Sequence, residues 1–534
     1  SVVNGFESIT GQVNVESKKP ESAEALYGNV YVNSMGKTDL NLNLSTKVGK
    51  YWSTALLVHD AFLNNSKVDF NKDGFRDQPT GNLFTIMNRW KFNNNKGWLG
   101  QIGFRILSDN KVGGETAFNE KQDKLTTTHY GAGLKTDRKE VFAKIGYVFP
   151  EKKYKSVGLQ LSAFRHDMDT YFGLTTYKAL QHNFYANLIY QSIIGNSNHK
   201  FRTGLSFVAD NYDETYKLTR YYRTENVPGA FFEYTFSSSD KFNLIAGIRA
   251  DHNSLFGFFV TPRLHMKYQP AKGTIIRIGT GRGQRTANIF SENTSVFVSS
   301  RQVNIIASAN GKAYGLNPEV AWSTGIGIDQ QFRLMGRRGS IGVDFFRTDF
   351  NQQVITDLDV TAREVNFYNL DGRSFANSFQ AEINYELLKK LDLRVAYRLF
   401  DVQTTYHGEL MERPLIAKHR GFANLAYQTG TWKFDYTISM NGSKRIPTTG
   451  DNPVTEQQPG MSPSYTIMNA QVSKTVGNKF PIDLYVGVEN LTNFYQEKVI
   501  LGSGDPFGPY FDASLIWGPV AGRMFYGGVR VKIK

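Results

Sequence analysis

Apolar and polar residues alternate in short segments along the whole chain. The clearest segment covers 432–441, and its apolar positions are Trp432, Phe434, Tyr436, Ile438 and Met440. Four further segments repeat the pattern, at 242–249, 391–398, 482–489 and 525–534. A period of two is typical of a β-strand with one apolar and one polar face. Strands between lipid and a wet interior alternate in this way, so the pattern predicts an all-β chain that forms a transmembrane antiparallel β-barrel.

Two kinds of connection separate the predicted strands. Alternation and turn residues together predict about 22 strands, an even number as in bacterial single-chain barrels. Tight connections, expected to be periplasmic turns, occur at 93–97, 195–199, 237–240, 270–273, 335–339 and 428–431. Long polar connections, expected to be extracellular loops, occur at 62–81, 108–139, 168–181, 281–316, 442–463 and 491–522. Binding residues concentrate in such loops.

Composition favours one large barrel and argues against several other classes. The 534 residues contain no linker-like stretch, and 14% are aromatic, which suits the aromatic girdles of a barrel. No apolar run approaches the length of a membrane-spanning helix. The absence of cysteine excludes disulfides and thiolate metal sites. The net charge of +14 is scattered without a basic stripe, so we expect no nucleic-acid partner. Attraction to anionic outer-leaflet lipid or anionic solutes is an alternative to a simple effect on solubility.

Five short motifs follow one another in the order found in a known family. Residues 5–20 resemble the last strand of the plug domain of TonB-dependent outer-membrane receptors, and 487–493 resemble their near-terminal Glu-Asn-Leu signature. The motifs between them are 261–264, 281–288 with Glu292, and 317–319 with Trp322 and Gly325. The chain departs from the family pattern at Lys534, where an aromatic residue usually closes the barrel, and in lacking most of the plug.

The resemblance implies a domain organisation and a function. Residues 1–22 would be the C-terminal end of the plug, and 23–534 the barrel, in the outer membrane of a Gram-negative bacterium. The barrel would import a scarce nutrient, such as a ferric siderophore, haem, cobalamin or a copper complex, and TonB, ExbB and ExbD would energise it through an N-terminal region that this sequence lacks. A surface lipoprotein partner stays open. The alternative function is a plugless passive pore or a ligand-binding shell.

One loop segment has the spacing of a calcium site. Residues 69–77 match the first nine positions of a calcium-binding loop. Oxygen ligands and the turn glycine stand at the expected offsets, and the proposed ligands are Asp69, Asn71, Asp73, Phe75 through its carbonyl, and Asp77. The bidentate glutamate expected at the twelfth position is replaced by Thr80. The segment therefore predicts either a structural Ca²⁺ or a turn that binds nothing.

Arginine and aromatic residues in two predicted loops are candidates for ligand contact. Arg282, Arg285 and Arg301 could meet an anionic ligand through forked hydrogen bonds. The family resemblance implies instead that Arg282 and Arg285 face the plug. In the last loop, the aromatic side chains that could stack on a flat ligand or a partner protein are Tyr510, Phe511 and Trp517. Packing of that loop against its neighbours is the alternative.

Histidine and methionine residues at two loop rims suit a soft or borderline metal such as copper. One group contains His166, Met168 and His182, and the other contains His407, Met411 and His419. Isolated rim residues are the alternative, because nothing in the sequence brings either group together. No grouping of serine, histidine and acid stands out at the predicted strand ends, so we do not expect an enzyme.

Overall fold

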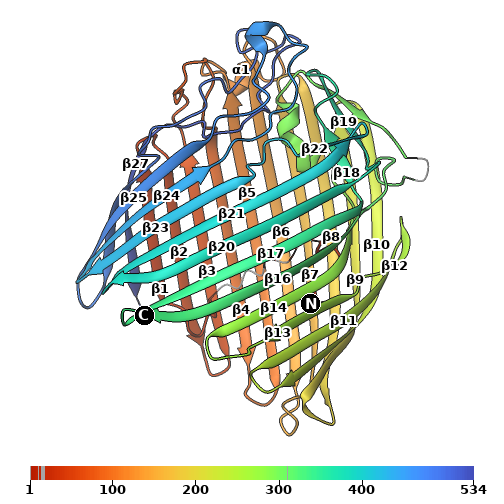
Figure 1. The fold of residues 1–534 in the computed structure, drawn as a ribbon, viewed down its shortest axis with the longest axis vertical. Coiled ribbons are helices and arrows are strands. Elements are labelled where there is room, and N and C mark those ends of the chain that lie inside the picture. Colours follow the sequence, from red (N-terminus) through yellow and green to blue (C-terminus); the bar gives the residue numbers. More distant parts are fainter. Residues whose placement is uncertain (1, 10, 12, 14–17, 309–310, 534) are drawn as a thin grey trace.

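The computed structural model describes residues 2–9, 11, 13, 18–308 and 311–533, and they form one closed antiparallel barrel (Figure 1). In this part of the chain, 24 strands join the main sheet. Two barrel strands are interrupted, so that β12 and β13 form one and β22 and β23 form another. The barrel therefore has 22 strands across its wall, which confirms the predicted fold class and strand number.

The wall strands follow one another around the barrel in chain order. The first half comprises β1 (Leu26–Asn33), β2 (Thr38–Val48), β3 (Trp52–Leu63), β4 (Thr80–Asn93), β5 (Trp98–Gly114), β6 (Gly131–Val148), β7 (Ser156–Phe172), β8 (Thr175–Ile194), β9 (Asn196–Tyr216), β10 (Thr219–Ser238) and β11 (Phe242–Asn253). The second half comprises β12 (Gly257–Val260), β13 (Arg263–Tyr268), β14 (Thr274–Arg285), β16 (Glu319–Leu334), β17 (Arg337–Gln352), β20 (Ser374–Leu388), β21 (Leu391–Tyr406), β22 (Glu409–Glu412), β23 (His419–Thr429), β24 (Trp432–Asn441), β25 (Tyr465–Val476), β26 (Ile482–Glu489) and β27 (Met524–Ile533).

The first and last strands close the barrel. β1 pairs with β27 as well as with β2, and Val30 lies opposite Val529 across the closing pair. Closure removes the free sheet edges that lipid cannot solvate. No helix in the described residues is both long enough and apolar enough to cross a membrane.

The two faces of the wall differ as the alternation predicts. Large apolar side chains such as Ile248, Ile326 and Phe345 are exposed on the outer face. Aromatic residues gather near the short turns, where the Trp52 ring lies 5.0 Å from Phe92 and Trp98 lies 5.0 Å from Tyr147. This arrangement fits an aromatic girdle at one membrane interface.

The connections at one end of the barrel are short, and we call it the short-turn end. The six tight connections predicted from the sequence all lie there, at 94–97, 195, 239–241, 269–273, 335–336 and 430–431. The other end, the long-loop end, carries α1 (Glu120–Asp123), η1 (Ser291–Phe297) and η2 (Val454–Glu456). It also carries a small sheet of β15 (Gln302–Ile305), β18 (Val354–Asp357) and β19 (Glu364–Asn369).

One predicted loop is wrong, and another is shorter than predicted. Residues 168–181 form no long loop, because β7 and β8 continue through them and are joined by Gly173 and Leu174 alone. The predicted loop 108–139 is shortened to 115–130 by extension of β5 and β6. The loop 353–373, which carries β18 and β19, was not predicted. Strands that extend beyond lipid no longer need an apolar outer face, so alternation stops marking their ends.

Loops from six connections pack on one another at the long-loop end, and we call this unit the cap (Figure 1). The cap comprises loops 64–79, 115–130, 286–318, 353–373, 442–464 and 490–523. Its core contains buried aromatic side chains from five of these loops and from β7, β8 and β9, namely Phe75, Tyr130, Phe172, Tyr177, Tyr216, Phe290, Phe297, Phe367 and Phe511. The loops therefore share one apolar core with the barrel wall.

Candidate functional site

A buried arginine joins three loops of the cap. Arg301 donates from Nε to Asp512 Oδ2 over 2.9 Å, and its Nη1 donates to the carbonyl oxygens of Leu358, Thr361 and Glu364 over 2.9–3.3 Å. The Arg301 side chain is fully buried. The position predicted for ligand contact is therefore occupied by a structural cross-link between loops 286–318, 353–373 and 490–523.

Arg282 and Arg285 lie on the inward-facing rim of the barrel. Arg282 donates to the Val260 carbonyl over 2.8 Å and to Gln284 over 3.1 Å. Arg285 holds Glu292 through two hydrogen bonds of 2.8 and 2.9 Å and Glu319 through one of 2.5 Å. Of the two partners of Arg285, Glu319 belongs to the barrel wall and Glu292 to the cap. A free guanidinium fork for a ligand is therefore absent at Arg285 in this conformation.

The aromatic candidates of the last loop divide between core and surface. Phe511 is buried and lies 4.5 Å from Tyr130 and 5.9 Å from Phe75, measured between ring centroids. Trp517 is buried in a second cluster with Leu515 and Ile446. Tyr510 is exposed, 6.0 Å from the guanidinium of Arg363. Two of the three residues therefore pack inside the cap, and Tyr510 alone of the three can meet a ligand or partner.

The predicted calcium loop forms a tight series of hydrogen-bonded turns. Asp69 accepts from the Gly74 amide over 3.1 Å, and Asp73 accepts from the Phe75 amide over 2.9 Å. Asp77 accepts from the Phe70 amide over 2.5 Å. Burial, together with the negative charges of Asp73 and Asp69, raises the pKa of Asp77 to about 6.

Two observations bear on whether this loop holds a cation. Asp69 Oδ1 is buried and accepts no hydrogen bond from the described residues. Within the same described residues, no group of three or more histidine, cysteine or acidic side chains has the arrangement of a metal site. The carboxylates are thus close enough to repel one another but are not arranged as a complete ligand set.

The histidine and methionine candidates do not converge. His166 and Met168 point into the barrel, while His182 lies opposite Arg165 and so points outward, because successive residues of a strand face opposite sides. His407 contacts the buried Asp357 over 2.7 Å. His419 shares a hydrogen bond of 2.7 Å with Tyr397. Within the described residues, no three or more histidine, cysteine or acidic side chains are arranged as a metal site, so the histidines of these two groups form none with such neighbours.

A charged network inside the barrel was not predicted from the sequence. Arg223 contacts Glu225 over 3.0 Å, Glu214 over 3.3 Å and the Tyr314 hydroxyl over 2.6 Å, and it also donates to Asn288. The network ties loop 286–318 to β9 and β10. One sequence signal points to it: Arg223 and Glu225 are two residues apart on a strand and so share its inner face. The same spacing recurs at the buried pair Arg249 and Asp251.

The N-terminal residues lie inside the barrel, along the wall formed by β8–β14, and we call 2–9 the lumen segment. Its side chains Val2, Val3 and Phe6 are 1%, 5% and 6% exposed. Wall side chains donate to its backbone, including Asn187 to the Val3 carbonyl over 2.8 Å and Arg263 to the Ser8 carbonyl over 2.6 Å.

Two glycines of the wall allow this close approach. A Cβ atom at Gly283 would lie 2.7 Å from the Ile9 Cα atom, and one at Gly247 would lie 2.7 Å from a Val2 methyl carbon. Any larger residue would therefore push the segment from its seat.

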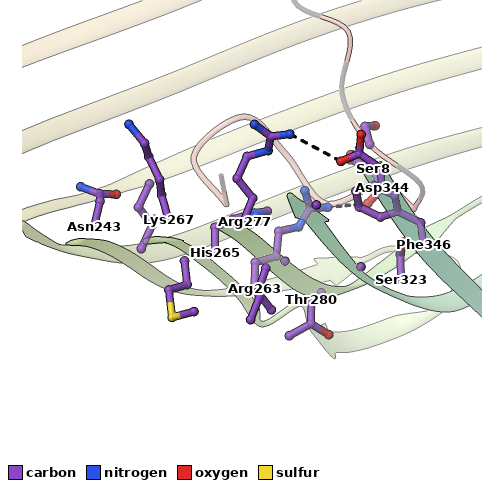
Figure 2. Close-up of a pocket in the computed structure, with 18 of the residues that line it drawn as sticks. Ser8, Asn243, Arg263, His265, Lys267, Arg277, Thr280, Ser323, Asp344 and Phe346 are labelled. Atoms are coloured by element: carbon purple, nitrogen blue, oxygen red, sulfur yellow. Dashed lines mark hydrogen bonds and ion pairs between the residues drawn. The ribbon is translucent and has the colours of Figure 1, made fainter. Parts of the chain in front are cut away.

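Several cavities remain in the lumen, and two of them are lined in part by residues that precede β1. One of about 460 Å³ lies between the lumen segment and the wall of β13–β17 (Figure 2). Another of about 950 Å³ lies against the wall of β2–β8 and is lined by cationic side chains that include Arg89, Lys91, Arg105 and Lys144. Both are large enough for a small solute or part of one. The structure thus combines a packed cap, a wall-bound segment and a basic lumen.

Comparison with known proteins identifies relatives at the level of fold and family. The family model for the β-barrel of TonB-dependent receptor-like proteins matches residues 22–491. The ferric-catecholate import receptor of E. coli K12 superimposes with a TM-score of 0.71 at 12% identity, over 98% of this chain and 84% of that one. A mutant of the ferric enterobactin receptor of Pseudomonas aeruginosa gives 0.69 at 13% identity, over 95% and 80%. A siderophore receptor from the same species gives 0.64 at 11%, over 97% and 82%.

A search of curated proteins finds no match. At such low identity the solved structures support the fold alone, while the family model covers most of the chain. Its members are receptors and transporters, in agreement with the expectation that the chain is not an enzyme. A large barrel of this family implies the outer membrane. The chain belongs to the family of TonB-dependent receptors.

Proposed function

We propose that this chain imports a scarce metal chelate of the siderophore type across the outer membrane and that TonB, ExbB and ExbD energise the step. One observation carries the proposal: a wide barrel has its loops packed into a cap at one end and a polypeptide segment seated inside its lumen. A barrel of this width is a channel unless something fills it, so a seated segment favours gated over passive transport.

We also propose that residues 1–22 are the C-terminal end of the plug. The lumen segment supports this, because its backbone lies on the inner wall and is bonded there by wall side chains. The family membership and the names of the structural neighbours, which are receptors for ferric siderophores, support the class of cargo. Haem, cobalamin and copper complexes are competing cargoes, and a surface lipoprotein and lipopolysaccharide are proposed outer partners.

The test is transport by cells that carry the natural gene. Uptake of radioactive iron supplied as ferric catecholate chelates is expected to need this gene, an intact tonB gene and a proton gradient. Parallel assays with haem, cobalamin and a copper chelate rank the other cargoes. Uptake that survives both loss of TonB and an uncoupler overturns energised import and leaves the passive pore. Growth and uptake unchanged by gene deletion for every chelate overturn the transport role itself.

A further inference from the structure

The cavity between the lumen segment and β13–β17 contains three nitrogen-bearing side chains in a row on one strand. Arg263, His265 and Lys267 alternate along β13 and line the cavity together (Figure 2). Each step of two residues advances about 6.6 Å along a strand, so the Cα atoms of Arg263 and Lys267 lie about 13 Å apart. The row lies near the short-turn end, because β13 ends at Tyr268.

The two cations of this row, Arg263 and Lys267, are not paired with an acid in the described part of the barrel. Neither Arg263, His265 nor Lys267 forms an ion pair with a carboxylate among the described residues. The neighbouring cation, Arg277, differs because it is paired with Asp329 and with Asp344, the latter over 3.5 Å. Among the described residues that line the cavity, Asp344 is the only acidic one. The cavity therefore has an excess of positive charge that favours an anion.

Glycines form the floor beneath these side chains. Gly279 of β14 pairs with Gly325 of β16, and Gly281 and Gly327 flank them on the same inner face. A Cβ at Gly281 would lie 2.8 Å from Arg263 Cγ, and one at Gly279 would lie 3.0 Å from His265 Nδ1. The glycines thus leave room for the Arg263 and His265 side chains to lie across the wall beside an open space.

The lumen segment competes for one of the three groups. The Arg263 guanidinium donates to the Ser8 carbonyl over 2.6 Å, which is its one hydrogen bond within the described residues. A carbonyl is an uncharged acceptor, whereas a carboxylate or phosphate adds its own negative charge and can accept two parallel hydrogen bonds from the guanidinium fork. An oxyanion that enters the cavity can therefore displace the carbonyl from Arg263.

We propose that this cavity is a binding site for a solute with several oxyanion groups, whether carboxylate, phosphate or catecholate, and that its occupancy loosens the lumen segment. Arg263 and Lys267 bind the charged groups, and Asn243 and Ser323 line the same space as polar contacts. The two equilibria are linked, so the factor by which a bound anion weakens the attachment of the segment is also the factor by which the attached segment weakens anion binding. The proposal does not depend on import, because it concerns binding to the purified barrel.

Citrate is the probe for the first experiment, with affinity measured by calorimetry on the purified chain in detergent. Arg263→Gln and Lys267→Gln are each expected to weaken citrate binding about tenfold, since each removes a charge-assisted contact. Lys267→Gln leaves the Ser8 contact intact and so reports on the anion alone. Lys144→Gln is the matched control, because Lys144 is a lumenal cation of the other cavity that forms no ion pair with described residues.

A second experiment measures the linkage to the segment. The chain has no cysteine, so a thiol introduced by Val3→Cys is the only one present. The Val3 side chain is 5% exposed, so a thiol at this position can react with a labelling reagent only when the segment leaves the wall. Citrate is expected to raise the labelling rate several-fold, and Lys267→Gln to shift that rise to higher citrate concentration. Absence of citrate binding, an equal loss in Lys144→Gln, or a labelling rate that citrate does not change overturns the proposal.

Discussion

The cap and the lumen segment are both attached to the same barrel, but by different physical means. The cap is built like the interior of a globular protein, with a large aromatic core and the fully buried pair of Arg301 and Asp512. The lumen segment buries three apolar side chains and is otherwise held through its backbone, by wall donors at the Val3 and Ser8 carbonyls and by Glu233 at the Val2 amide.

The difference indicates which of the two regions is suited to move. Local opening requires little free energy where few apolar contacts are lost, and much where a packed core is disrupted. The wall side chains that donate to these carbonyls can also donate to water or to another acceptor once the segment leaves. We therefore expect the cap to behave as a fixed part of the receptor and the lumen segment as a detachable one.

The largest expected effect comes from Arg301→Met, which leaves Asp512 as an unpaired buried charge. Breaking such a pair from one side costs about 3–5 kcal/mol. We expect loops 286–318, 353–373 and 490–523 to become sensitive to protease at temperatures at which the wild-type cap resists, while the barrel stays folded. Limited proteolysis with mass spectrometry measures this effect.

Arg363→Gln is the matched control for the cap. Arg363 pairs with Asp451 over 2.9 Å across two cap loops, but both side chains are partly exposed. An exposed pair contributes about 0–1 kcal/mol. If Arg363→Gln opens the cap as readily as Arg301→Met, the buried core is not what holds it, and the contrast with the lumen segment fails.

A second prediction concerns the seat of the lumen segment. Gly283→Val places side-chain atoms where the Ile9 backbone lies, and overpacking of this kind costs about 1–3 kcal/mol. We expect a thiol at Val3→Cys to react about tenfold faster in this background, with the protease pattern of the cap unchanged. Gly28→Ala is the control, because a Cβ there meets nothing within 4 Å. Cap and segment responding together to Gly283→Val would show that they are one cooperative unit.

Sequence reasoning was strong for the wall and weak for the cap, for a physical reason. A wall strand has lipid on one side, so the period of two follows directly from its surroundings. The tight turn at 335–336 is favoured by Gly336, which has a φ of 77°. Beyond the lipid both faces are wet or packed, and alternation disappears. The predictions therefore failed at 168–181, where β7 and β8 continue, and missed the loop 353–373.

The candidate site residues also differ in how well the sequence predicts their surroundings, depending on whether their partners are near or far in the chain. An arginine at position 301 or 285 is recognisable as an anion-binding group, but its partner is set by contacts that lie far away in the chain. Asp512, for example, is separated from Arg301 by 211 positions. The spacing of Arg223 and Glu225 is local and detectable, as are Arg263, His265 and Lys267 on one face of β13. The seat glycines Gly247 and Gly283 carry no signal until the lumen segment is placed.

The smallest expected effect tests whether a cation strengthens the cap at loop 64–79. If the loop binds Ca²⁺, a concentration about five times the Kd stabilises the folded loop by about 1 kcal/mol, and Asp73→Ala removes that gain. Asp240→Ala, in an exposed short turn, is the control and should respond to Ca²⁺ as the wild type does. Resistance of the loop to protease with and without Ca²⁺ is the measurement.

The pH dependence decides between a calcium site and a simple turn. The pKa of Asp77 is raised from 3.8 to about 6, so without a cation the protonated loop is the more stable one. Its contribution is complete below about pH 4 and is lost as pH rises through 6. Calcium needs ionised carboxylates, so stabilisation by Ca²⁺ should be small at pH 5 and full at pH 7. A loop whose resistance to protease is unchanged by Ca²⁺ at both pH values is an acidic turn that binds nothing, and the stability of the cap then does not depend on a cation.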